Sequence, residues 1–248
     1  MAAHKKSSLF ETVKTLVYAI IIALGIRTIA FEPFNIPSGS MIPTLLVGDY
    51  LFVAKFSYGY SRHSLPLSQP AFAGRLMFHE PDRGDVVVFK LPRDLKTDYI
   101  KRIVGLPGDT IQVKEGSLYI NGEVVKRERV EDFVERDRFG NETRIPQYIE
   151  TLPNGRAHRI VELSDFGSLD NTMVYTVPEG HYFAMGDNRD NSLDSRMPTA
   201  VGVGFVPAEN LVGRAEVLFF SVNGNAQLWE VWRWFEGIRF SRLLRSIE

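Results

Sequence analysis

Residues 109–125, "DTIQVKEGSLYINGEVV", decide the fold class of this chain. Their β-branched and aromatic residues form short runs between turn residues, a composition that is typical of β-strands. The pair Asn121-Gly122 readily adopts the positive φ angles of a type I′ turn, so we expect a tight hairpin there. The stretch therefore predicts two strands joined by a two-residue turn.

Further runs of the same kind flank this hairpin on both sides. Gly, Asp, Asn and Pro residues separate them, which favours short antiparallel strands. They are "DYLFVAKF" (49–56), "GDVVVFKL" (84–91), "DYIKRIVGL" (98–106), "MVYTVP" (173–178), "HYFAMGD" (181–187) and "AEVLFFSV" (215–222). The sequence thus predicts a mainly β, antiparallel domain.

The N-terminal part differs from the rest, because residues 15–31, "TLVYAIIIALGIRTIAF", contain one charge, Arg27. A helix of this length reaches about 26 Å, slightly less than the roughly 30 Å hydrocarbon core of a bilayer. Basic residues precede it, namely Lys5, Lys6 and Lys14. Because positive charge stays on the cytoplasmic side, we expect a transmembrane anchor with a cytoplasmic N-terminus and the remaining chain outside.

Two alternatives to an uncleaved anchor remain at this stage. A basic start followed by a short apolar region also describes a cleaved signal sequence, and a buried helix of a soluble protein has a similar composition. No Ala-X-Ala motif follows at the expected distance, where residues 32–34 are Glu-Pro-Phe. We therefore favour a single-pass anchor.

Two later regions lack the strand pattern. Residues 126–172 contain "KRERVEDFVERDRFGNETR", which mixes both signs of charge and predicts a polar insertion or subdomain. Residues 227–248, "QLWEVWRWFEGIRFSRLLRSIE", predict an amphipathic helix, either packed on the core or lying in the membrane interface. The expected organisation is 1–32 as N-terminus and anchor, 33–125 with 173–222 as the β domain, 126–172 as insertion or subdomain, and 223–248 as C-terminal helix.

Composition excludes several classes of function. A net charge of −1 with scattered Lys and Arg residues argues against a nucleic-acid partner. The chain has no cysteine, and its five histidines lack the spacing of a metal site. Asp187, Asp190 and Asp194 lack the ligand spacing of an EF-hand calcium loop. We therefore predict no metal and no cofactor.

A serine nucleophile is possible if a lysine replaces histidine as its base. Burial penalises an ammonium, so a buried lysine can be neutral near physiological pH, and Ser-Lys pairs are a known catalytic variant. In "DYIKRIVG" (98–105) strand alternation cannot choose between Lys101 and Arg102. Arginine is effectively never deprotonated, so only Lys101 can be a base. The "PSGS" stretch (37–40) is then either a turn or the site of a reactive hydroxyl.

Four stretches resemble the signature boxes of the type I signal peptidases, in their bacterial leader peptidase form. They follow the family order behind an N-terminal anchor and together frame residues 37–215. They are "PSGSMIPTLLVGD" (37–49), "DYIKRIVGLPGD" (98–109), "MGDNRDNSLDSR" (185–196) and "GFVPAENLVGRA" (204–215). One such box is suggestive, whereas four in series are highly specific.

The resemblance implies roles for individual residues. Ser40 would be the nucleophile, Lys101 the general base, and the Ser38 hydroxyl would join the Ser40 N–H in the oxyanion hole. Ser192 would orient the lysine amine, with Asp194 and Arg196 as a supporting ion pair. Shallow pockets for small substrate side chains would be lined by Phe34, Ile36, Met41, Leu45, Tyr99 and Ile100.

The implied function is removal of signal peptides from exported preproteins after Ala-X-Ala, at the outer face of the bacterial inner membrane. The implied partners are signal peptides, membrane lipid and the protein export machinery. Two other classes remain as alternatives. A self-cleaving Ser-Lys regulator would need an N-terminal DNA-binding region where this chain has an anchor, and a membrane-tethered binding module would need no nucleophile.

Overall fold

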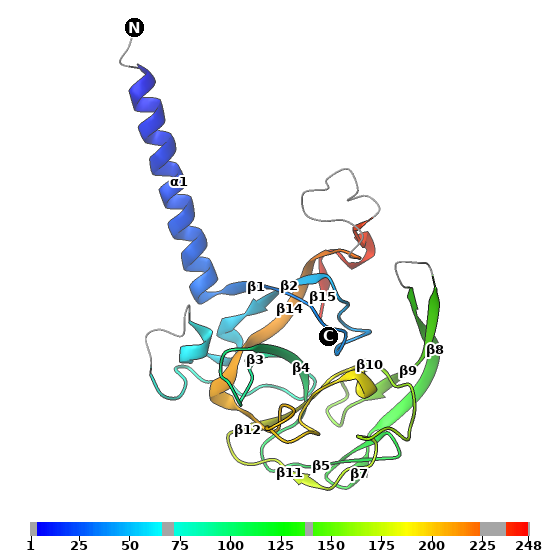
Figure 1. Ribbon diagram of the computed structural model, residues 1–248. Coiled ribbons are helices and arrows are strands. Elements are labelled where there is room, and N and C mark those ends of the chain that lie inside the picture. The colour runs from blue at the N-terminus through cyan, green and yellow to red at the C-terminus, as the bar shows by residue number, and fades with distance from the viewer. Residues whose placement is uncertain (1–3, 66–71, 137–140, 224–236, 248) are drawn as a thin grey trace.

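The computed structural model describes residues 4–65, 72–136, 141–223 and 237–247, and shows one long helix that projects from a body of β-sheets (Figure 1). The helix is α1 (His4–Ile29), and the sheets are antiparallel throughout. This arrangement confirms the predicted fold class, a mainly antiparallel β protein with an N-terminal apolar helix.

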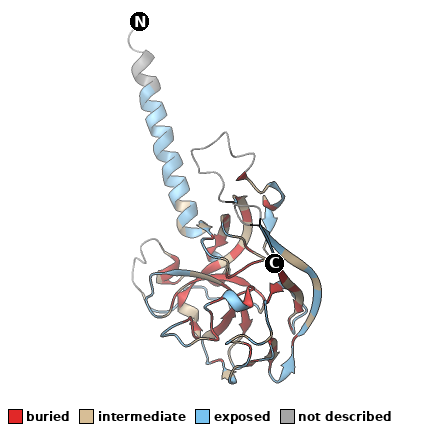
Figure 2. Cartoon of the chain, turned by 45° about the vertical axis from the view of Figure 1, so that its right-hand side comes forward, coloured by how far each residue is buried: buried red, intermediate tan, exposed pale blue. Residues whose placement is uncertain are grey.

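From Leu9 to Ile29, helix α1 is exposed at nearly every position, as the pale blue ribbon in Figure 2 shows. Its segment Leu9–Ile29 has a mean hydropathy of 1.9, and none of it is buried in the protein. A helix of 21 residues reaches about 32 Å, close to the thickness of a hydrocarbon core. An apolar helix without a protein partner over most of its surface suits a lipid environment.

The largest sheet has eight strands and carries the residues of the candidate site. Its order is β1 (Phe31–Asn35), β2 (Asp49–Ala54), β14 (Leu211–Ser221), β3 (Val86–Lys90), β4 (Asp98–Gly105), β12 (His181–Met185) and β13 (Val206–Pro207), with β15 (Arg245–Ser246) beside β14. Val86 and Val88 enter one core cluster, whereas Val87 and Phe89 enter another. Because successive strand residues point to opposite faces, both faces of β3 are buried.

The predicted hairpin lies in a second, four-stranded sheet. This sheet has the order β11 (Tyr175–Thr176), β5 (Thr110–Lys114), β6 (Ser117–Ile120) and β7 (Glu123–Val124). Between β6 and β7, Asn121 has φ 55° and Gly122 has φ 83°. Both central residues therefore have the positive φ of a type I′ turn, which confirms the hairpin predicted from the sequence.

Residues 126–172 contain a third sheet, of three strands. They are β8 (Lys126–Arg136), β9 (Glu142–Thr151) and β10 (Ala157–Val161), with β9 in the middle. The Val161 N–H donates to the Asp187 carbonyl at 2.9 Å, so β10 is fastened to the loop that follows β12. Short 3₁₀ helices connect other elements: η1 (Lys55–Tyr58), η2 (Arg62–Ser64), η4 (Arg189–Asn191), η5 (Ala208–Asn210) and η7 (Phe240–Arg242).

The C-terminal helix predicted for residues 223–248 is not formed by residues 238–247, so that prediction is wrong there. Ile238 makes a β-bridge to Val222, and η7 and β15 follow. The buried Arg242 side chain donates to both oxygens of Asp49, at 3.0 and 2.5 Å. This ion pair, made from the short 3₁₀ helix η7, holds the segment against the domain. Residues 224–236 lie outside the described part of the chain.

Candidate active site

Ser40 lies in the loop between β1 and β2, and a second loop fixes its backbone. Inside the loop, the Ile42 N–H donates to the Gly39 carbonyl at 3.1 Å. From the loop after β12, the Asn188 N–H donates to the Ser40 carbonyl at 3.1 Å, and the Asn188 side chain donates to the Gly39 carbonyl at 3.0 Å. These three hydrogen bonds therefore fix the backbone of Gly39 and Ser40, from which the Ser40 side chain extends.

The Lys101 side chain from β4 reaches this serine. Lys101 Nζ lies 2.6 Å from Ser40 Oγ, a hydrogen-bonding distance, and 2.9 Å from the Ile100 carbonyl oxygen. Lys101 is 3% exposed. Burial lowers the pKa of Lys101 to about 8, although the carboxylates of Asp194 and Asp187 oppose this change. At neutral pH a larger fraction of this amine is therefore uncharged than in a solvent-exposed lysine.

Asp194 and Arg196 form a buried ion pair beside this site. Asp194 accepts from the Arg196 guanidinium at 3.0 and 2.9 Å, and from the Gly186 N–H at 3.1 Å. Burial alone would raise the pKa of the Asp194 carboxyl, but the Arg196 charge and the hydrogen bonds from Arg196 and Gly186 together hold that pKa below its usual range. Asp194 thus stays ionised and keeps the loop that carries Gly186 in place.

Ser192 differs from the sequence-based expectation. Its hydroxyl is buried and makes no hydrogen bond to the described residues, so the expected bond to the Lys101 amine is not made. A Cβ built on Gly186 would clash with this hydroxyl and would lie 2.5 Å from the Ser40 carbonyl oxygen. The Ser192 hydroxyl is therefore packed close to the backbone of the nucleophile loop.

A second buried ion pair, between Arg102 and Asp187, was not predicted from the sequence. Arg102 donates to both Asp187 oxygens, at 2.9 and 2.8 Å, and Thr44 donates to the same carboxylate at 2.5 Å. Thr44 belongs to the Ser40 loop. The pair therefore joins β4, the loop after β12 and the nucleophile loop. Two adjacent residues of β4 thus serve different purposes, Lys101 at the serine and Arg102 in the framework.

A pocket of about 540 Å³ opens onto Ser40 and Lys101. Among the expected pocket residues, Phe34, Ile36, Tyr99 and Ile100 line it, and so does the exposed Ser38. Met41 and Leu45 do not line it, because both are fully buried in the core cluster that contains Ile36. The lining also includes residues that sequence reasoning did not select: Asn35, Pro37, Val88, Thr97, Asp98, Asn191 and Leu193.

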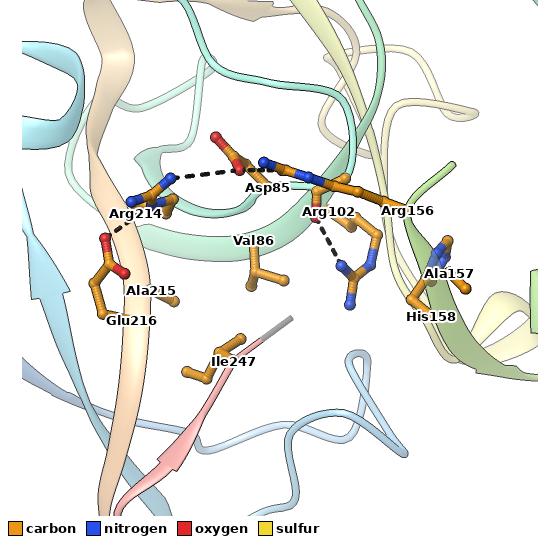
Figure 3. A pocket seen from close by; sticks show the side chains of 11 residues that line it. Asp85, Val86, Arg102, Arg156, Ala157, His158, Arg214, Ala215, Glu216 and Ile247 are labelled. Carbon is orange, nitrogen blue, oxygen red and sulfur yellow. Dashed lines mark hydrogen bonds and ion pairs between the residues drawn. The ribbon is translucent and has the colours of Figure 1, made fainter. Parts of the chain in front are cut away.

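A separate cavity of about 400 Å³ lies between β3, β14 and β10 (Figure 3). In this cavity the Asp85 carboxylate lies 2.7 Å from the Arg156 guanidinium and 3.9 Å from that of Arg214. The charged side chains that line the cavity are therefore largely paired with one another. None of its lining residues lines the pocket at Ser40. Within the described residues, no group of three or more His, Cys, Asp or Glu side chains is placed to hold a metal ion.

Comparison with known proteins agrees with the signature boxes. The family model "Signal peptidase, peptidase S26" matches residues 9–220. Signal peptidase I of Rickettsia typhi is 41% identical over 93% of this chain and 90% of its own length, and that of Rickettsia conorii is 40% identical over 98% and 97%. A crystal structure of a signal peptidase I from Enterococcus faecalis is 27% identical, covers 55% of this chain and 97% of its own, and has a TM-score of 0.32. The sequence matches carry the assignment: the chain belongs to the peptidase S26 family of signal peptidases.

Proposed function

We propose that this chain is a membrane-bound signal peptidase that uses Ser40 and Lys101 to cut signal peptides from exported preproteins. Family membership confirms the predicted enzyme class, a serine endopeptidase. The observation that carries the catalytic assignment is the 2.6 Å distance between the buried Lys101 amine and the Ser40 hydroxyl. The cut is expected after small residues in an Ala-X-Ala pattern.

In the proposed mechanism, Ser40 Oγ attacks the scissile carbonyl carbon while the neutral Lys101 amine accepts the hydroxyl proton. The resulting ammonium then donates that proton to the nitrogen of the leaving peptide, and the C–N bond breaks. A water molecule then attacks the acyl carbon while the same amine accepts its proton. The bond between that carbon and Ser40 Oγ breaks, the ammonium returns the proton to Oγ, and the signal peptide is released. The Ser38 hydroxyl and the Ser40 N–H would stabilise the oxyanion.

The lowered pKa of Lys101 allows this residue to act as a base near neutral pH. With a pKa of about 8, about one amine in ten is neutral at pH 7. A lysine with its ordinary pKa of 10.5 would be neutral in only about one molecule in three thousand. Burial therefore increases the population of the reactive form by a factor of about 300.

Strand β1 offers an edge on which a peptide substrate can bind. It is the terminal strand of its sheet, and the Ala30 carbonyl and the Ile36 N–H both bond to β2 or its flanks. Because backbone groups alternate in direction along a strand, the Pro33 carbonyl and both backbone groups of Asn35 point to the outer edge. An extended substrate would add here as a further strand, with its small side chains in the pocket at Ser40.

Ser192, Asp194 and Arg196 are proposed as positioning residues. The buried ion pair between Asp194 and Arg196 holds the loop that packs on Ser40. The Ser192 hydroxyl is buried next to that loop without a hydrogen-bond partner among the described residues. We propose that the Ser192 hydroxyl accepts a hydrogen bond from the Lys101 ammonium during the reaction, when Lys101 is no longer hydrogen-bonded to the Ser40 hydroxyl.

The exposed apolar helix indicates a membrane-anchored protein. We propose a single pass through the bacterial inner membrane, with residues 1–32 as cytoplasmic N-terminus and anchor and the catalytic domain outside. Phe31 and Phe56 are 38% and 49% exposed just beyond α1, with ring centroids 5.4 Å apart, and we propose that they contact lipid. The β domain of 33–125 and 173–222 would be catalytic, with 126–172 as its subdomain and the export machinery as a neighbour.

The proposal is tested by incubating a preprotein that has an Ala-X-Ala site with purified full-length variants. Ser40→Ala and Lys101→Met should fold and leave the preprotein intact. Exposed residues give matched controls, and Ser168→Ala and Lys126→Met should cleave like the wild type. Cleavage by either dyad variant contradicts the mechanism. A self-cleaving regulator would instead cut only its own chain, and a binding module would be indifferent to Ser40→Ala.

A further inference from the structure

A cavity of about 460 Å³ lies between the end of α1 and the catalytic domain. Leu24, Arg27 and Thr28 line it from α1, and the domain contributes Glu32, Phe34, Lys55, His63, Leu65, Lys90, Asp98 and Val212. Phe34 and Asp98 also line the pocket at Ser40. The two spaces are therefore neighbours, and together they lead from the nucleophile to the membrane helix. We call the cavity of about 460 Å³ the corridor.

An ion-pair chain fixes the end of α1 to the domain at this corridor. Glu32 in β1 contacts Arg27 of α1 at 3.2 Å with one oxygen and Lys55 at 2.8 Å with the other. The Lys55 side chain is only 2% exposed, so losing Glu32 would leave a buried charge unpaired. The corridor is thus a defined feature of the fold, with one wall made by the anchor itself.

The geometry also gives the corridor a direction and a length. The five residues of β1 run from the end of α1 to the loop that carries Ser40. A substrate strand on its outer edge advances about 3.3 Å per residue, so about five substrate residues span the length of β1. A signal peptide has its apolar segment in the membrane, so the part upstream of the cut must point toward α1.

We propose that the corridor binds the stretch of the signal peptide just upstream of its pocket-filling residues, and that the last turns of α1 contact the apolar segment that precedes it. This inference rests on the proposed function. It makes α1 a substrate-binding element in addition to an anchor. About five residues would lie between the pocket and the contact with Thr28, about eight residues before the cut.

The walls indicate which substrate residues fit. Leu24, Phe34, Leu65 and Val212 supply apolar surface. The charged side chains on the walls form ion pairs with one another. Glu32 pairs with Arg27 and Lys55, and Asp98 pairs with Lys90 at 2.8 Å. A charged substrate residue would be partly desolvated without a free partner. We therefore infer that the corridor selects uncharged segments.

Disulfide crosslinking tests the contact, because the chain has no native cysteine. Thr28→Cys, on the corridor wall, is compared with Ile26→Cys, which is 53% exposed and does not line the corridor. Both are made in full-length Ser40→Ala protein, in lipid vesicles. Preproteins with one cysteine at successive upstream positions are added, with copper phenanthroline and oxygen as oxidant. We expect at least fivefold more crosslinking from Thr28→Cys, with a maximum about eight residues before the cut.

A second pair of variants measures the effect on catalysis. Thr28→Trp should fill the corridor and raise KM at least fivefold with little change in kcat, whereas Ile26→Trp should leave both unchanged. Equal or absent crosslinking from the two cysteines, or equal kinetics of the two tryptophan variants, overturns the corridor. The wild-type enzyme is assayed on the same preproteins. Failure of the wild type to cleave them would instead overturn the proposed function, so the two failures are distinguishable.

Discussion

Replacing Lys101 by Met should stabilise the protein at neutral pH while it abolishes cleavage. The Lys101 amine has a pKa of about 8 in the folded protein, against 10.5 for an unperturbed lysine. Each pH unit of that difference corresponds to 1.36 kcal/mol, so holding the ammonium in its buried site costs about 3 kcal/mol. Methionine has a similar length and no charge. Losing the contact with Ser40 costs about 1 kcal/mol, which leaves a net gain of about 2 kcal/mol.

The pH dependence of this gain distinguishes charge from packing. The folded-state pKa is lowered, so wild-type stability rises between pH 8 and pH 10.5, where the unfolded chain keeps the proton and the folded chain has lost it. The advantage of Lys101→Met should therefore be full below pH 8 and should reverse at high pH. Above about pH 10.5 the variant should be about 1 kcal/mol less stable than wild type, because only the loss of the contact with Ser40 remains. Urea unfolding of full-length protein in detergent, followed by circular dichroism, measures both values. A variant that is less stable than wild type at pH 7 would refute the argument that burial lowers the pKa of Lys101.

Two further substitutions test the framework around the dyad. Gly186→Ala should reduce cleavage at least tenfold, because the new Cβ would lie 2.5 Å from the Ser40 carbonyl oxygen; unchanged cleavage of a preprotein by this variant would show that the nucleophile loop tolerates displacement. Arg242→Met should lower the free energy of unfolding by about 1 to 3 kcal/mol, because it removes two charge-assisted hydrogen bonds to the buried Asp49 carboxylate, which keeps Arg239 at 3.8 Å and a hydrogen bond from Ser221. Arg245→Met, at an exposed position of the same segment, should change it by less than about 0.5 kcal/mol, and equal effects in urea unfolding would contradict the role of the ion pair.

The sequence predicted the strands and the tight turn because their signals are local. The type I′ turn depends on two adjacent residues, Asn121 and Gly122. By contrast, the fates of Lys101 and Arg102 depend on partners 61 and 85 residues away, Ser40 and Asp187. Alternation along one strand cannot reveal such distant partners. The alternation pattern therefore does not distinguish Lys101 from Arg102, and it does not indicate that both side chains are buried.

Two regions were harder to predict for the same reason. The sequence of β8 is a run of charged residues, which is typical of a segment that faces water. The strand nevertheless pairs with β9. Most of its charged side chains are exposed, so the sequence alone does not indicate the pairing. Nearby, the buried Glu150 of β9 pairs with Arg189 at 2.5 Å, from a distant loop. At the C-terminus, Arg242 belongs to a pattern that predicts an α-helix. Residues 238–247 instead form a β-bridge, the short 3₁₀ helix η7 and β15, and Arg242 pairs with the distant Asp49.

Apolar pocket residues could not be separated from core residues by type. Ile36 and Met41 belong to the same core cluster, yet only Ile36 lines the pocket at Ser40. Leu193, by contrast, is 50% exposed at that pocket and lies in a box whose charged residues dominated the interpretation. Which apolar side chain faces a substrate is set by how loops fold over the sheet, and no residue pattern in the sequence encodes that directly.

The pH dependence of kcat/KM tests most directly whether neutral Lys101 is the base. With a pKa of about 8, kcat/KM should fall about tenfold for each pH unit below 8 and reach a plateau above it, so that activity at pH 6 is about 1% of the plateau. Circular dichroism over the same range should show a folded protein throughout. A kcat/KM that stays constant from pH 8 to pH 6 would contradict the account, because the ammonium form of Lys101 cannot take the proton of Ser40.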